Sequence, residues 1–587
     1  ADMTVTLGNE AGDTIDITTL TANGGTSAAD TGGDAAITVT GVMSDASGGI
    51  NVNGGTGAAT IGGASTITVT QAVAALSGAI DINGGASAGA AAGGAAKLVF
   101  SSSVTTTANA TIDGGAAGTG AGNGGASELE VDGVWSGASN TITITGGTAG
   151  TATNAADGGV ATGNFDAAVT AKGISVIGAN GSAAAFTADG GAAILTVDGG
   201  AATIGTTGLT VTAGNGGAGD AATLGGNSTA TLSSTSAITG TIRVTGGTAG
   251  STNNGANAGA AYLTFTDDVV ATDQSMVITG GDGASTNTAN GGAATVEIIA
   301  TSTFSSVELD DGTANDGTKG SATLLFDAAA AETFTGAVTA AVDGEGTITI
   351  ENSNATGLTV ANAIGISGTS IGTLNIGTTA EAHAIFTSNV FADTINISAA
   401  TASSSANFNG NITGALAITD GGAANIASVN IFGNVTGTIT FTDAGTGDDA
   451  TATFDGTSAQ TISGAVDGAA SSAGGIITAN LVGVTFSSAV GAVQSLELID
   501  VAASNIVTFD STVASDALTV ADAANLTFNG TATVTTTTIA NTNTTAITVG
   551  TGFSSGTAAA ASDNVILGDL VVTTTAADTI TVTMPSN

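Results

Sequence analysis

The chain of 587 residues contains no cysteine, one proline (Pro585), one histidine (His383) and one tryptophan (Trp135). The absence of cysteine excludes disulfide bonds, thiol redox chemistry and cysteine-based zinc sites. A single histidine also excludes the histidine-rich metal sites. No run of about 18 strongly apolar residues occurs, so no transmembrane helix is expected.

Basic residues are almost absent. The chain has 47 acidic residues and only four basic ones, Lys97, Lys172, Arg243 and Lys319, so its formal net charge is −43. No lysine or arginine follows Lys319. Since so little positive charge is available to neutralise phosphates, the sequence argues against nucleic-acid binding and against anionic membrane surfaces. Small cations are the partners that this charge favours.

The composition is dominated by glycine, alanine, threonine and serine, and the chain contains 92 glycines. Hydrophobic residues still make up 42% of the chain, which argues against disorder. They alternate with Thr, Ser, Asn and Asp at a period of two, as in ITVT, INVN, ITIT and IRVT. This alternation predicts strands with one buried face, whereas helical spacing is nearly missing.

A repeat of 22 to 23 residues marks the C-terminal half. Residues 408–418, FNGNITGALAI, return as IFGNVTGTITF at 431–441. Each unit has an apolar anchor, three small or polar residues, a Val or Ile, and then two apolar residues two positions apart. Phe454 keeps the spacing although the rest of its unit departs from the pattern. The anchors assigned in this way are Phe386, Phe408, Ile431, Phe454, Phe486 and Phe509.

The N-terminal half uses the same unit at a spacing of 31 to 35 residues, with anchors that include Val69, Phe100, Val131 and Phe165. The extra length is a Gly-rich insert after the apolar pair of each unit. Insertions at one position in every repeat map to one face of a stack. The inserts quoted for this pattern are 82–96, 144–159, 244–261 and 278–294.

Short strands, Gly corners and a period of 20 to 35 residues predict an all-β fold, a parallel β-helix (β-solenoid) of roughly 16 to 18 coils. Residues 1–345 are expected to form long coils of 31–35 residues, and residues 346–587 short coils of 22–24 residues that continue the first part.

The repeat resembles the right-handed β-helices of exported bacterial surface proteins, especially autotransporter passenger domains. The acidic, Cys-free, Gly/Ala/Thr-rich composition is similar to that of surface-layer and sheath-forming proteins. The resemblance covers about residues 35–580 through the period alone, since no family-specific motif occurs. It implies an extracellular or cell-surface location. The start at Ala1 without a basic and apolar leader is expected of an exported chain whose signal peptide has been removed, and equally of a sequence trimmed at that point.

Catalysis is not expected. His383 is the only imidazole, so a Ser-His-acid site has one place to form, and a lone histidine in a turn is more often structural. Calcium is the candidate cofactor, because Asp-rich corners supply the hard oxygen ligands it prefers. The candidate ligands come from the two densest acidic corners, and they are Asp310, Asp311, Asp316, Asp443, Asp448 and Asp449.

The leading functional hypothesis is a structural protein that polymerises with itself into a filament, sheath or surface layer. Both ends begin or finish in strand-like sequence without an amphipathic cap, and open strand edges recruit other strands. The alternative is an adhesin or passenger that binds a host, a particle or a neighbouring cell, with cell-surface polysaccharide or lipopolysaccharide as candidate partners. An enzyme and an ice-binding protein are minor alternatives.

Overall fold

The computed structural model describes most of the chain. The described residues are 1–8, 10, 12–58, 60–120, 122–151, 156–182, 189–217, 225–248, 258–272, 274–283, 290–313, 319–421, 425–442, 450–469, 475–480, 483–541, 545–549, 552–555, 566–567, 570–574 and 580–583. They contain strands and no helix. They form two compact units, Ala1–Leu325 and Phe326–Asn587.

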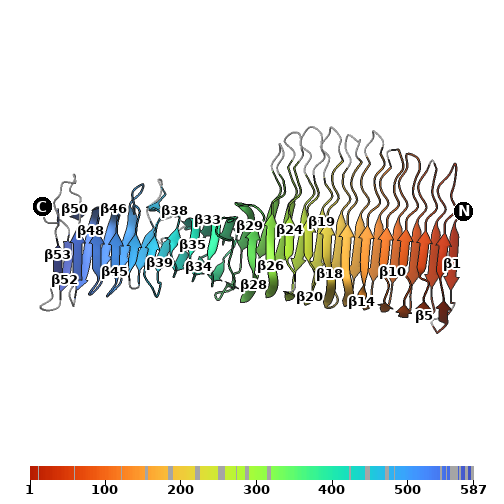
Figure 1. Cartoon of the computed structure of the whole chain (residues 1–587), viewed down its shortest axis with the longest axis horizontal. Helices are drawn as coiled ribbons and strands as arrows, with labels where there is room; N and C mark the ends of the chain where they lie inside the picture. The colour runs from red at the N-terminus through yellow and green to blue at the C-terminus, as the bar shows by residue number, and fades with distance from the viewer. Residues whose placement is uncertain are drawn as a thin grey trace. The chain divides into compact units, whose positions relative to one another are not determined.

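Unit 1 (Ala1–Leu325) is a stack of coils, each made of three short strand segments separated by corners (Figure 1). The first segment of successive coils is β1 (Met3–Leu7), β4 (Ala35–Val39), β7 (Ser65–Val69), β10 (Ala96–Phe100), β13 (Ser127–Val131), β15 (Ala161–Phe165), β17 (Ala193–Val197), β19 (Ser228–Leu232), β22 (Ala261–Phe265) and β25 (Ala293–Ile298). The second is β2 (Thr14–Ile17), β5 (Val42–Ala46), β8 (Val73–Leu76), β11 (Val104–Thr106), β14 (Trp135–Thr145), β16 (Val169–Ile177), β18 (Ala202–Thr212), β20 (Ser236–Ile238), β23 (Val269–Ala271) and β26 (Ser302–Asp310). The third is β3 (Leu20–Asn23), β6 (Ile50–Asn53), β9 (Ile80–Asn83), β12 (Ala110–Asp113), β21 (Ile242–Thr245) and β24 (Met276–Thr279), while β14, β16, β18 and β26 each span the second and third positions. β27 (Ser321–Phe326) lies at the division between the units.

Each strand of unit 1 pairs in parallel with the equivalent strand of the next coil. Register partners lie 28 to 35 residues apart, as Thr14 with Val42 and Ala193 with Ser228. The predicted parallel β-solenoid is therefore confirmed. Parallel pairing gives the strands between the first and last coils backbone partners on both sides. The alternating burial of β4, β7 and β10 places Ile37, Ile67 and Leu98 in one core row.

The Gly-rich inserts of unit 1 leave the stack at one corner of each coil, as their described parts show in Figure 1. Their two legs are joined by backbone hydrogen bonds: Gly33 N–H donates to Gly25 O (2.7 Å), Gly55 N–H to Gly33 O (2.8 Å) and Gly63 N–H to Gly55 O (2.8 Å). We call this zigzag the glycine seam, and it continues through Gly85, Gly94, Gly115, Gly125, Gly147 and Gly159. A Cβ on Gly55 would collide with the carbonyl oxygen of Gly25, which explains why the paired glycines recur.

Unit 2 (Phe326–Asn587) repeats the three-segment coil with shorter corners. The first row is β28 (Glu332–Ala340), β30 (Leu358–Val360), β32 (His383–Phe386), β34 (Ser404–Phe408), β36 (Ala427–Ile431), β39 (Thr451–Phe454), β42 (Ile476–Ala479), β44 (Leu496–Val501), β46 (Val513–Val520), β48 (Thr531–Asn541) and β52 (Leu570–Thr574). The second is β33 (Val390–Ser398), β35 (Ile412–Thr419), β37 (Val435–Thr436), β40 (Gln460–Ile462), β43 (Val484–Phe486), β45 (Ile506–Phe509), β47 (Asn525–Phe528), β49 (Thr545–Val549) and β53 (Ile580–Thr583). The third adds β29 (Glu345–Ile350), β31 (Ile371–Ile376), β38 (Ile439–Thr442), β41 (Val466–Gly468), β50 (Gly552–Ser555) and β51 (Ile566–Leu567).

The number of coils was underestimated from the sequence. Ten strands occupy the first row of unit 1 and eleven occupy that of unit 2 among the described residues, so there are more coils than the expected 16 to 18. The spacings between partners in unit 2 include 19 residues (Val501 with Val520) and 35 residues (Thr545 with Ile580). The expected spacing of 22–24 residues therefore lies within a wider range, because strand pairing fixes the register while corners vary in length.

Two of the predicted anchors occupy a different row. Phe386 pairs with Phe408, Phe408 with Ile431 and Ile431 with Phe454, as the repeat predicts. Phe454 then pairs with Ala479, whereas Phe486 and Phe509 follow Ile462 in the second row. The assignment of Phe486 and Phe509 as anchors equivalent to Phe454 is wrong, because a large apolar side chain can fill the core from either side of a corner.

Aromatic stacks run through the core of unit 2. The rings of Phe486 and Phe509 lie 5.0 Å apart at 8°, and those of Phe509 and Phe528 lie 5.1 Å apart at 6°. All three are fully buried. Among the described residues, no helix is long and apolar enough to cross a membrane.

Candidate functional site

The predicted calcium ligands that the structure describes both have partners from their own chain. Asp310 ends β26, and its Oδ1 accepts from Gly312 N–H at 2.9 Å. Asp311 Oδ1 accepts from Ala322 N–H at 2.7 Å, and its Oδ2 lies 3.6 Å from Lys319 Nζ. The two carboxylates thus stabilise the turn that leaves β26, and each has already met part of its hydrogen-bonding capacity.

The other four predicted ligands, Asp316, Asp443, Asp448 and Asp449, lie outside the described residues. Among the residues that the structure does describe, no three His, Cys, Asp or Glu side chains come together as a metal cluster. Calcium therefore stays a prediction, with Asp310 and Asp311 placed and the rest unplaced.

His383 meets two polar side chains on the outer face of unit 2. Its Nδ1 lies 2.7 Å from Ser405 Oγ, and its Nε2 lies 3.1 Å from Glu381 Oε1. Ser405 is the register partner of His383 in the next coil, so the repeat of 22 residues could have identified it. His383 is the only histidine of the sequence, and the period already indicates that Ser405 lies beside it.

These three side chains have the composition of a Ser-His-acid site, but not its surroundings. An acyl-transfer site needs backbone N–H groups free to stabilise an oxyanion near the serine. Ser405 N–H instead donates to Ala382 O (2.8 Å), and His383 N–H donates to Asn352 O (2.9 Å). The geometry fits a hydrogen-bonded link between two coils better than it fits a nucleophile.

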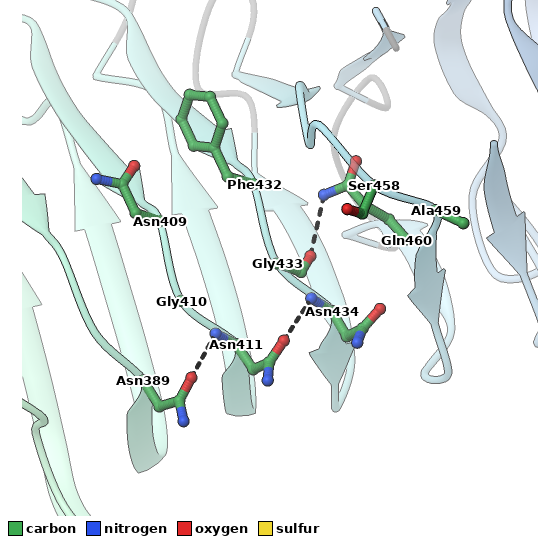
Figure 2. Close-up of a pocket in the computed structure, with 10 residues that line it drawn as sticks. All are labelled: Asn389, Asn409, Gly410, Asn411, Phe432, Gly433, Asn434, Ser458, Ala459 and Gln460. Carbon is green, nitrogen blue, oxygen red and sulfur yellow. Dashed lines mark hydrogen bonds between the residues drawn. The ribbon is translucent and has the colours of Figure 1, made fainter. Parts of the chain in front are cut away.

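A hollow of about 350 Å³ lies at the corner between the first and second rows of unit 2 (Figure 2). We call it the corner hollow. Its floor is a row of three asparagines at the same position of successive coils, Asn389, Asn411 and Asn434, together with Gly410 and Gly433. Asn409 and Phe432 occupy equivalent positions of two successive coils, since their N–H groups donate to Phe386 O and Phe408 O.

The asparagine row is held by the backbone of the next coil. Asn389 Oδ1 accepts from Asn411 N–H (2.9 Å), and Asn411 Oδ1 accepts from Asn434 N–H (2.9 Å). Asn434 Oδ1 accepts from Thr461 N–H (2.8 Å). Because each oxygen faces a backbone donor, each Nδ2 amino group must face away from it, and Figure 2 shows the three nitrogens on the same side.

One wall of the corner hollow comes from an irregular coil. The corner from Phe408 to Ile412 has the same length as the next one, from Ile431 to Val435. The corner after that runs from Phe454 to Ile462 and is four residues longer. Ser458 and Ala459 of this longer corner line the hollow. The departure of the Phe454 unit from the repeat was visible in the sequence, and the structure shows that its extra residues form this wall.

Gln460 fixes the longer corner in place. The side chain is 3% exposed, and its Nε2 donates to Ile431 O (2.8 Å) and Gly433 O (3.0 Å) while its Oε1 accepts from Gly456 N–H (3.1 Å). A buried amide with these three partners is well satisfied and holds two coils together. The corner hollow is therefore built from ordered, uncharged groups, with amide donors along one side and the half-buried ring of Phe432 among its lining residues.

Comparison of the chain with protein-family models, with curated proteins and with solved structures found no match.

Proposed function

We propose that this protein is a structural component that assembles with copies of itself into a filament, sheath or surface layer outside the cell. The observation that carries the proposal is the regularity of its outer faces. Outward residues of neighbouring coils stand in register, as Thr6 with Thr38 and Thr38 with Thr68. A contact made between two copies at one coil can therefore be repeated at the next.

Repetition turns weak contacts into stable association. Each additional coil in contact adds to the same binding event without a new loss of translational freedom, so a long registered face gains avidity. The polar side chains on these faces are small, and they offer hydroxyl and amide groups to a neighbouring copy without burying a charge. Faces of this kind support lateral packing of solenoids better than a single concave site would.

The charge supports control of assembly by ions. With a net charge of −43, copies repel one another at low ionic strength, and salt or divalent cations reduce that repulsion. Two of the four basic side chains form ion pairs within the chain. Lys97 Nζ lies 2.9 Å from Glu128 Oε1, and Lys319 Nζ lies 3.6 Å from Asp311 Oδ2. Calcium bridging between carboxylates of different copies would supply the missing positive charge.

Analytical ultracentrifugation tests this proposal. The protein at low ionic strength with a chelator is expected to sediment as a monomer, and millimolar calcium is expected to convert it to large assemblies. Sodium chloride of matched ionic strength separates screening from bridging, and magnesium separates calcium geometry from divalent charge. A monomer that persists in millimolar calcium at high protein concentration would contradict the proposal.

An adhesin is the second candidate function, and the corner hollow is the observation that favours it. An adhesin presents a localised binding site on an otherwise regular scaffold. The corner hollow lies where the repeat is interrupted at the Phe454 unit, which is where a specific site would be expected in a solenoid.

A further inference from the structure

We propose that the corner hollow of unit 2 binds a neutral glycan, extended along the direction in which the coils stack. This inference rests on neither self-assembly nor calcium. It starts from the asparagine row, whose amide orientation is fixed by the backbone.

The row presents a series of amide donors. The Oδ1 atom of each asparagine accepts one hydrogen bond from an N–H group of the next coil, at 2.8 to 2.9 Å, and the three residues are Asn389, Asn411 and Asn434. Their Nδ2 groups have no partner among the described residues, and each carries two hydrogen atoms. Coils stack at about 4.8 Å, so the donors form a regular series that fits a chain-like ligand with repeated oxygen acceptors.

Phe432 adds an apolar surface to the lining of the corner hollow. It is only half buried, and Figure 2 shows its ring projecting from the ribbon on the opposite side of the corner from the asparagine nitrogens. The electron-rich face of an aromatic ring attracts the weakly positive C–H groups of a pyranose, whose hydroxyls remain free for hydrogen bonds. An exposed ring combined with a few fixed polar groups is the usual composition of a small-molecule site.

The site is preorganised. Gly410 and Gly433 add no side chains of their own to the floor beside the asparagines, and a Cβ on Gly433 would collide with the carbonyl oxygen of Gly410. Gln460 fixes the wall through its bonds to Ile431 O and Gly433 O. Little conformational entropy is therefore lost on binding, which lowers the cost of capturing a weakly interacting sugar.

The charge of the chain selects a neutral ligand. Every residue that lines the corner hollow is uncharged, and unit 2 contains no lysine or arginine at all. The strongly negative chain repels uronates, sulfated sugars and phosphorylated glycans. Neutral hydroxyls accept hydrogen bonds from the asparagine amides without that penalty.

Isothermal titration calorimetry of the full chain with a panel of neutral hexasaccharides tests the inference. The panel comprises cello-, malto- and manno-hexaose, with oligogalacturonate of the same length as the anionic comparison. The Asn434→Asp variant keeps the Oδ1 acceptor for Thr461 N–H but removes the donor, and Phe432→Leu keeps an apolar side chain but removes the ring. Asn109→Asp is the matched control, because Asn109 Oδ1 caps Thr141 N–H (3.0 Å) in unit 1.

At least one neutral hexasaccharide is expected to bind, and oligogalacturonate is expected not to bind. Asn434→Asp and Phe432→Leu should each weaken that binding by about tenfold, the equivalent of about 1.4 kcal/mol, while Asn109→Asp should bind as the wild type does. No binding by any neutral member, or equal binding by all four proteins, overturns the inference. A loss of self-association in Asn434→Asp without any glycan binding also overturns it, because the row would then contact another copy of the chain.

Discussion

At the residue scale, amide side chains that repeat in register add hydrogen bonds between coils. Asn53 Nδ2 donates to Asn23 Oδ1 (2.8 Å), and Asn83 Nδ2 donates to Asn53 Oδ1 (2.9 Å). The next position of this row is Asp113. Burial raises the pKa of the Asp113 carboxyl above its ordinary value, the hydrogen bond from Thr145 lowers it, and the nearby Asp81 raises it further.

Replacing Asp113 with asparagine should therefore stabilise the protein at neutral pH. A carboxyl whose pKa is raised by folding contributes stability below its unfolded pKa, and this contribution is lost as the pH rises through the folded pKa. Asp113→Asn removes that loss and lets the amide donate to Asn83 Oδ1, for an expected gain of about 0.5–1.5 kcal/mol at pH 7. Urea denaturation should show a clearly smaller gain near pH 3.

Asp30→Asn controls for the change in net charge, since Asp30 is exposed on an insert of unit 1. This variant should leave the urea midpoint unchanged. If Asp113→Asn were no more stable than the wild type at pH 7, the proposed hydrogen bond from position 113 to Asn83 would be refuted.

The aromatic core of unit 2 gives a second test at this scale. Phe509 is 1% exposed and stacks on both Phe486 and Phe528. Phe509→Ala should lower the free energy of unfolding by about 3–5 kcal/mol, because it leaves a cavity between two rings, and Phe509→Leu should cost less. Val493→Ala, at a side chain that is 68% exposed, should be nearly neutral in the same urea titration. Equal effects at the two positions would show that the stack does not stabilise the core.

At the element scale, the glycine seam joins the inserts of unit 1 into one hydrogen-bonded layer. Gly85 N–H donates to Gly63 O (2.8 Å), and Gly85 O accepts from Gly94 N–H (2.7 Å). A Cβ at Gly85 would collide with the carbonyl oxygen of Gly55, a backbone atom that cannot move without shifting its own coil. The described legs of these inserts are therefore part of the stacked structure.

Gly85→Ala should destabilise the insert layer by about 1–3 kcal/mol, the usual cost of forcing an extra methyl into a packed site. Hydrogen exchange should accelerate at the amides of Gly85 and Gly94. Gly12→Ala is the matched control, because a Cβ on Gly12 meets nothing within 4 Å. If the exchange rates of the seam amides were unchanged in Gly85→Ala, the seam would not hold the layer.

The sequence predicted the coils because strand alternation and period are local signals, and both appear in β4, β7 and β10. It did not predict the row of Phe486, because the corner after Phe454 is longer and the next coil can place its phenylalanine on either side of it. The corner hollow could not be predicted from the sequence for a related reason. Asn389, Asn411 and Asn434 are visible as repeated corner residues, but the free direction of their amides depends on backbone N–H groups of the following coil.

At the scale of the whole molecule, the central claim is that regular, acidic faces serve self-association. In this proposal, the registered threonine rows of unit 1 would supply repeated contacts, and the charge of −43 would make association depend on ions. The corner hollow adds a separate, localised site in unit 2. Assembly and glycan binding are therefore expected to be separable by mutation, with Asn434→Asp leaving assembly intact.

Electron microscopy of the protein in millimolar calcium, compared with the same sample in chelator at low ionic strength, tests the central claim most directly. A regular filament or two-dimensional lattice is expected in calcium, and isolated molecules are expected in chelator. Isolated molecules under both conditions, at a protein concentration where surface proteins assemble, would contradict it.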